Sequence, residues 1–185
     1  MTTTEKPDVI ELLVAQHQHI RELFADVESA SGAEKQRRFE ELRRFLAVHE
    51  TAEELITHPR VRMSGANDVV DARLEEETES KKLLAAMDGM DVSETDFDPR
   101  LRTLRIAVLA HADAEEREEF PLLREAADDR QLRVMALALQ AVEAIAPTHP
   151  HPSVGSSMTT NLMAGPLASV VDRTRDAVAA VLRKG

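Results

Sequence analysis

Apolar residues recur every three or four positions along most of the chain, which is the period of an amphipathic α-helix. Extended alternation of polar and apolar residues, which marks half-buried strands, is missing from the sequence. The pattern therefore predicts an all-α fold. It predicts four long helices, over about residues 8–30, 33–57, 67–87 and 99–121. Asp8 is expected to cap the first helix, and prolines at positions 59 and 121 are expected to stop the second and the fourth.

Four long helices joined by short connections form an up-and-down bundle. A fifth helix over about residues 131–146, an extended linker over 147–166 and a closing amphipathic helix after it are predicted to pack on this bundle. We therefore expect a four-helix bundle over residues 8–128 and a C-terminal helical extension over residues 130–185. The apolar side of the closing helix is suited to packing or to a dimer contact, so the chain is expected to be a monomer or a homodimer.

One phrase is written twice on the predicted bundle: "HETAEELITHP" begins at His49 and "HADAEEREEFP" begins at His111. Both read His, two variable residues, Ala-Glu-Glu, four more residues and Pro. Residues four apart lie on one face of a helix, about 6 Å apart along its axis, so His49 points with Glu53 and His111 points with Glu115. Because each pair follows the apolar positions of its helix, we expect both pairs to point into the bundle.

The first helix adds a third inward histidine, His17, whereas His19 is turned about 200° away and should face solvent. Buried carboxylates beside imidazoles require protonation, ion pairs or a metal, and a metal accounts for two such pairs in phase better than chance does. The second glutamates of the two phrases, Glu54 and Glu116, lie about 100° further round their helices and are expected at the bundle edge or in solvent.

Composition limits the chemistry further. The chain has no cysteine, so a metal must be held by nitrogen and oxygen donors. Its 34 acidic and 23 basic residues give a net charge of −11, which argues against nucleic acid and against an anionic membrane surface as partners. No basic start precedes an apolar run and no 18 apolar residues follow one another, so we expect a soluble cytoplasmic protein.

The stretches "VIELLVAQHQHIRELF", "HETAEELITHP", "EEETESKKLL" and "HADAEEREEFPLL" resemble the hemerythrin-like, HHE cation-binding domain family, and the end of the chain resembles the C-terminal extension of actinobacterial members. The resemblance implies a cofactor of two iron ions in an oxo- or hydroxo-bridged centre. It implies that the ligands include His17, His49, Glu53, His111 and Glu115. Glu53 and Glu115 are the natural bridges, because a bridging carboxylate holds two cations close together while offsetting their charge.

The third helix departs from the oxygen-carrying pattern of this family. Members usually place a histidine where this chain has Glu77, and we expect Glu77 to be the sixth ligand. Helical angles also allow Glu76, and a run of charges such as "LEEETESKK" is often simply solvated. His58 stands where relatives often have Tyr. Because it is about 180° round from His49, we expect it outside the ligand set or at the surface.

His149 and His151 in "PTHPHP" could offer two metal ligands, but they are expected to belong to a linker that merely packs. The main inventory of three His and three Glu is richer in oxygen donors than that of the oxygen carriers, and hard donors favour ferric iron. We therefore expect a non-haem di-iron protein acting on H₂O₂ or O₂, with catalase-like peroxide disproportionation as the leading hypothesis. The alternatives are a carrier or sensor of O₂ or NO, and iron storage or metal buffering.

Overall fold

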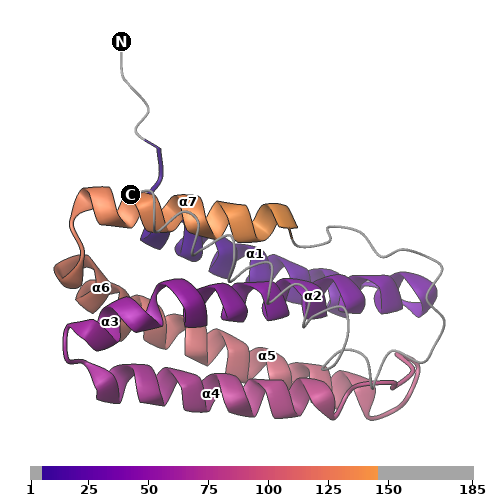
Figure 1. The fold of residues 1–185 in the computed structure, drawn as a ribbon. Helices are drawn as coiled ribbons and strands as arrows, with labels where there is room; N and C mark the ends of the chain where they lie inside the picture. Colours follow the sequence, from indigo (N-terminus) through magenta and orange to yellow (C-terminus); the bar gives the residue numbers. More distant parts are fainter. Residues whose placement is uncertain (1–5, 146–185) are drawn as a thin grey trace.

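The computed structural model describes residues 6–145, and within that range the chain is helical apart from short connections. The long helices are α1 (Val9–Ser29), α2 (Gly32–Ile56), α4 (Asn67–Ala85) and α5 (Phe97–Ala114). They run alternately up and down, with α1 packed on α2 and α4 packed on α5 (Figure 1). The predicted all-α bundle is confirmed.

Shorter elements close one end of the bundle. α3 (His58–Met63) follows α2, and a π-helical turn (Glu115–Glu119, η1) joins α5 to α6 (Phe120–Ala126). α3 and α6 lie against each other at the same end of the molecule (Figure 1). Pro59 and Pro121 therefore act differently from expectation. Each stands in the first turn of a new short helix, where a missing backbone N–H costs nothing.

The fifth helix is present as α7 (Asp129–Ile145), which packs on α1 and α2 (Figure 1). Leu132, Met135 and Leu139 are its main buried side chains. The expected linker, with His149 and His151, and the closing helix lie outside the described residues. The division into a bundle over 8–128 and an extension over 130–185 therefore stays a prediction.

Local sequence accounts for several helix boundaries. Asp8 caps α1 as predicted: its side chain accepts a hydrogen bond from the backbone N–H of Glu11, and the Glu11 side chain accepts one from that of Asp8. α5 begins at Phe97, two residues before Pro99, where the fully buried Phe97 ring packs edge-on against Phe39. Gly65, with φ 95°, makes the connection from α3 to α4, because side-chain-bearing residues rarely adopt that conformation.

Two apolar clusters fill the bundle, one at each end. One contains Leu13, Ala52, Val70 and Leu123, and the other contains Ile20, Leu46, Met87 and Val108. α1, α2 and α4 each carry residues that pack in both clusters, whereas α5 belongs to the second cluster and the chain reaches the first one in α6. Between the clusters, each of these stretches carries buried histidine or glutamate. A polar layer therefore lies across the middle of the bundle, sealed by apolar side chains on both sides.

Candidate metal centre

The polar layer gathers four histidines and four glutamates, each at most 5% exposed: His17, His49, His58, His111, Glu53, Glu77, Glu115 and Glu119. α1 supplies one of them, α2 supplies two, α4 supplies one, and α3, α5 and η1 supply the rest. All six residues that the sequence suggested as ligands lie in this layer. Burying so many ionisable groups is costly unless they are paired or bind a cation.

A first group of donors converges tightly. One ligand atom from each of His17, His49, Glu53 and Glu115 can be chosen so that all four atoms lie within 4.8 Å of one another. The His17 Nε2 atom is 3.2 Å from Glu115 Oε2 and 3.8 Å from Glu53 Oε1, and the His49 Nε2 atom is 3.3 Å from Glu53 Oε2. With metal–ligand bonds of about 2.1 Å at right angles, neighbouring donors are expected about 3 Å apart, so this spacing suits a metal ion.

Glu115 connects this group to His111. Its Oε2 atom is the one near His17, whereas its Oε1 atom lies 3.4 Å from His111 Nε2. Its two oxygens therefore face histidines of two different helices, which is the arrangement of a carboxylate that bridges two cations. Both oxygens of Glu53, by contrast, face the first group, since one lies near His17 and the other near His49.

The inward-facing atoms lack hydrogen bonds even though they are buried. These atoms are Nε2 of His17 and His111, both carboxylate oxygens of Glu53 and Glu115, and Oε2 of Glu119. Buried polar atoms are nearly always hydrogen-bonded, and leaving one unpaired costs about 1–3 kcal/mol. Unpaired imidazole nitrogens and carboxylate oxygens that converge on one region fit a bound metal. The residues present therefore fit the cation that the sequence implied.

The outer nitrogen of each predicted histidine ligand is held in place. The Nδ1 atom of His17 lies 2.8 Å from Glu116 Oε1, and the Nδ1 atom of His111 lies 3.0 Å from Glu76 Oε2. The Nδ1 atom of His49 lies 2.7 Å from Gln16 Oε1. An acceptor at Nδ1 places the proton there, which leaves the Nε2 lone pair free for a metal.

These contacts refine the expectations for neighbouring residues. Glu116 is 31% exposed, as an edge residue should be, but it also orients His17. The Glu54 side chain is 41% exposed and pairs with Lys81, and the His19 side chain is 47% exposed. Glu77 is buried while the Glu76 side chain is 39% exposed, so the geometry favours Glu77 as the inward residue of α4.

The expectation that His58 could lie at the surface is wrong. The residue is 2% exposed, its Nδ1 atom is 2.7 Å from Glu119 Oε1, and its Nε2 atom is 2.9 Å from Glu77 Oε1. The helical angle from His49 does not apply, because α2 ends at Ile56 and His58 is the first residue of a separate helix, α3.

Sequence reasoning missed Glu119 as well. It lies four residues after Glu115, so the same spacing rule that paired His111 with Glu115 would have found it. The two glutamates stand at the two ends of the π-helical turn. Such turns occur mostly inside α-helices, and they are frequent at functional sites.

Charges within the metal-free layer shift several pKa values. Burial lowers the pKa of His17, but the carboxylates of Glu115 and Glu53 outweigh it and raise the value to about 10. His58 follows the same balance: burial is outweighed by Glu119 and Glu77, and its pKa is also about 10. Burial raises the pKa of Glu53 well above its ordinary value, and the nearby Glu115 adds to this rise.

The pKa shifts of His49 and Glu77 go in the direction opposite to those of His17 and Glu53. Burial and the positive charge of the neighbouring histidines lower the pKa of His49 well below its ordinary value. Burial alone would raise the pKa of Glu77, but His58 and Lys81 lower it to about 2. The metal-free layer therefore holds protons on some ligands, and a cation has to displace them when it binds.

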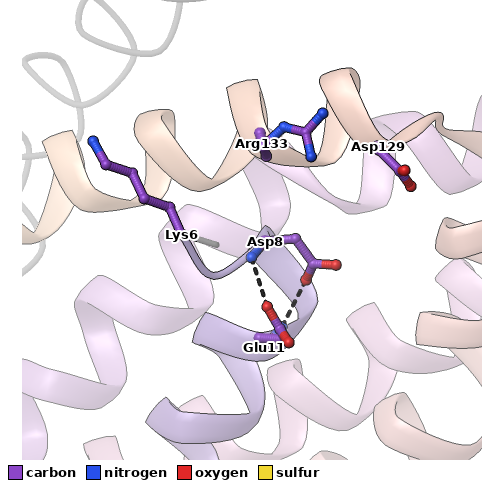
Figure 2. Close-up of a pocket in the computed structure, with 5 residues that line it drawn as sticks. All are labelled: Lys6, Asp8, Glu11, Asp129 and Arg133. Atoms are coloured by element: carbon purple, nitrogen blue, oxygen red, sulfur yellow. Dashed lines mark hydrogen bonds between the residues drawn. The ribbon is translucent and has the colours of Figure 1, made fainter. Parts of the chain in front are cut away.

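A surface pocket of about 230 Å³ lies away from this layer, where the start of α1 meets the start of α7 (Figure 2). It is lined by Lys6, Asp8, Glu11, Asp129 and Arg133. Asp8 and Glu11 are engaged with each other in the helix cap, as the dashed lines in Figure 2 show. The lining mixes both signs of charge and points to no single class of ligand.

Comparison with known proteins identifies the architecture. Residues 8–123 match the family model of the hemerythrin HHE cation binding domain. The chain belongs to this family. Among solved structures, a hemerythrin HHE cation binding domain-containing protein from Mycobacterium kansasii superposes with a TM-score of 0.71 at 22% identity, covering 91% of this chain and 99% of the other. That likeness shows the hemerythrin fold alone.

Curated relatives of this hemerythrin-like chain are distant. An uncharacterised hemerythrin-like protein of Schizosaccharomyces pombe is 25% identical over 134 residues, and a DNA nickase of a Nostoc species is 27% identical over 128 residues. The matches cover 71% and 69% of this chain, but 66% and 36% of those relatives. In the described part of the chain, helices that are both long and apolar enough to span a membrane are absent.

Proposed function

We propose that the chain binds two iron ions in the polar layer and catalyses the disproportionation of hydrogen peroxide. The observation that carries this proposal is the set of buried imidazole and carboxylate atoms that face one another without hydrogen bonds. A cation-binding family supports a metal, and hard oxygen donors beside imidazoles suit iron.

The proposed ligands divide between two positions. His17, His49 and Glu53 would hold the first ion, and His111 and Glu77 would hold the second. Glu115 would be shared between the two positions, because its two oxygens face His17 and His111.

When bound, the two irons supply the two electrons that reduce one peroxide to water, and a second peroxide returns them as it becomes O₂; the balance is 2 H₂O₂ → 2 H₂O + O₂. The chain contributes by excluding water with the two apolar clusters. Glu116, Gln16 and Glu76 fix the three imidazoles so that little reorganisation accompanies the change in iron charge.

Two features favour peroxide over reversible oxygen carriage. Carboxylates make up half of the six proposed ligands, and anionic oxygen donors stabilise ferric iron, whereas a carrier needs a long-lived ferrous pair. The chain also contains no cysteine, so peroxide meets no thiol that it could oxidise irreversibly. The nickase activity named for the Nostoc relative does not carry over to this chain, because the match covers 36% of that protein and the net charge of −11 disfavours phosphate binding.

The test is oxygen release from peroxide by iron-loaded protein, followed with an oxygen electrode without added reductant. Catalytic O₂ release by the wild type, its loss in His49→Ala and its retention in His19→Ala would support the proposal. A protein that stays diferrous in air, binds O₂ or NO reversibly and releases no O₂ from peroxide would be a carrier or sensor. Uptake of many irons per chain would indicate storage.

A further inference from the structure

His58 begins α3 and reaches into the polar layer at the side of α4. Its ring is buried between two carboxylates that are themselves buried, Glu77 at Nε2 and Glu119 at Nδ1. α2 ends at Ile56, and His58, as the first residue of α3, contacts carboxylates of α4 and of η1. His58 stands directly before the Pro that ends the first repeated phrase, where the second phrase has Phe120.

The surroundings of His58 partly resemble those of the three predicted histidine ligands. His17, His49 and His111 each have Nδ1 near a side-chain oxygen outside the layer and Nε2 near a carboxylate oxygen inside it. In His58, Nδ1 is 2.7 Å from Glu119 and Nε2 is 2.9 Å from Glu77. Those inward distances are 3.2, 3.3 and 3.4 Å for the other three. His58 differs from them in two ways: its Nε2 atom is hydrogen-bonded to Glu77, and the residue at its Nδ1 atom, Glu119, belongs to the layer itself.

We propose that His58 is a fourth imidazole ligand, which binds the second metal ion through Nε2 beside Glu77 and His111. Glu119 holds the ring through Oε1 and offers its other oxygen to the same ion. This inference rests on the proposed two-ion site and assigns the ligands of its second position.

Three observations support a ligand over a simple buried ion pair. Glu119 Oε2 is fully buried without a hydrogen bond, although the residue accepts one at Oε1. His58, Glu115 and Glu119 each offer a ligand atom within 4.8 Å of the other two, and Glu115 also belongs to the first group. Without His58 the second position has one imidazole where the first has two. With His58 the two positions are balanced.

The experiment loads full-length metal-free protein with Fe(II) under anaerobic conditions and records proton NMR spectra in H₂O and D₂O. A histidine bound through Nε2 keeps its proton on Nδ1, and that proton gives a strongly shifted, exchangeable signal near a paramagnetic ion. We expect four such signals in the wild type, from His17, His49, His58 and His111. His58→Gln should remove one, and His19→Gln, at an exposed histidine, should remove none.

Iron titration gives the second readout. His58→Gln keeps an amide that can contact Glu119, and we expect it to lower the affinity for the second Fe(II) at least tenfold while the first Fe(II) still binds. Glu119→Gln keeps an acceptor for the His58 ring but loses the free carboxylate oxygen, so it should weaken the second Fe(II) without removing a signal. Circular dichroism of the metal-free variants checks that both are folded.

The outcomes separate the two claims. Wild-type protein that binds two Fe(II) ions but shows three signals, with no change in His58→Gln, would overturn the ligand assignment and leave the two-ion site standing. Unchanged affinity for the second Fe(II) in both variants would do the same. Wild-type protein that never binds a second Fe(II) would refute the proposed function itself.

Discussion

Replacing Glu53 by Gln should have opposite effects on the metal-free and the metal-loaded protein. Glu53 is fully buried, and neither of its carboxylate oxygens has a hydrogen bond. Its pKa is raised by burial and then by the neighbouring Glu115. A carboxyl group whose pKa is higher in the folded than in the unfolded chain lowers the stability of the fold as pH rises from the unfolded-state pKa towards the folded-state pKa. At pH 7 Glu53 therefore weakens the metal-free fold. Glutamine has the same shape and cannot ionise.

The gain is the difference between burying a carboxylate that can ionise and burying a neutral amide of the same shape, on the order of 1–3 kcal/mol. A chain of this length changes its melting temperature by about 2–4 °C per kcal/mol. Metal-free Glu53→Gln should therefore melt about 2–12 °C higher than metal-free wild type at pH 7. The gain should shrink near pH 4, where the wild-type carboxyl group is protonated in both the folded and the unfolded chain.

The loaded protein should respond in the other direction. A ligand present at a thousand times its dissociation constant stabilises the fold by about 4 kcal/mol, and Glu53→Gln removes a donor on which that stabilisation depends. The assay is differential scanning calorimetry of both forms, with iron content measured on the same samples. Glu54→Gln is the matched control, because Glu54 is the adjacent glutamate, its side chain is 41% exposed and it pairs with the half-exposed Lys81. A metal-free Glu53→Gln that melts below wild type, or a loaded variant with full iron content, would refute the reasoning.

Three further outcomes are expected. His17 and His58 have pKa values of about 10 in the folded chain, above the ordinary value near 6.5, so the stability that they contribute is complete below pH 6.5 and is lost as pH rises towards 10. Urea unfolding of metal-free protein should therefore show lower stability at pH 9.5 than at pH 6.5, and a flat or rising profile would contradict this. Glu77→Gln should weaken binding of the second Fe(II) more than Glu76→Gln does, because an amide at position 76 can still accept a hydrogen bond from the His111 ring. A calorimetric titration that shows the reverse order would move the ligand to Glu76. Gly65→Ala should lower the free energy of unfolding in urea by about 1–2 kcal/mol without changing iron content, because φ is 95° at this position and the new methyl group would touch no neighbouring atom, so backbone strain is the cost. A neutral result would show that the turn relaxes.

The bundle and most of the polar layer could be predicted because both depend on helical period. His49 with Glu53 and His111 with Glu115 stand at a spacing of four within long helices, and His17 lies in phase with Leu13 and Ile20 on α1. Over such lengths the angle per residue is nearly constant, so direction could be calculated from position.

The period fails where a helix is interrupted. His58 follows the end of α2, and a calculation that continued the helix placed it on the wrong side. On α4 the inward positions carry Val70, Arg73, Glu77 and Ser80, so an apolar pattern could not reveal the buried face. The Arg73 guanidinium reaches Glu76 and Glu118, which explains how a charged residue occupies such a position.

The roles of polar neighbours were also beyond the pattern. Glu116 lies at the bundle edge, as its angle indicated, yet its carboxylate reaches His17 on another helix. Gln16 precedes His17 in the sequence and holds His49, which belongs to α2. Contacts of this kind depend on side-chain reach between helices, which helical angles do not describe.

The central claim is that the polar layer binds two metal ions. Metal-free protein loaded with Fe(II) under anaerobic conditions and then desalted should retain about two irons per chain by elemental analysis. Glu115→Gln, which removes the carboxylate whose oxygens face both histidine groups, should retain fewer than one. Wild-type protein that retains no iron after desalting, or a Glu115→Gln variant that retains as much as wild type, would contradict the account.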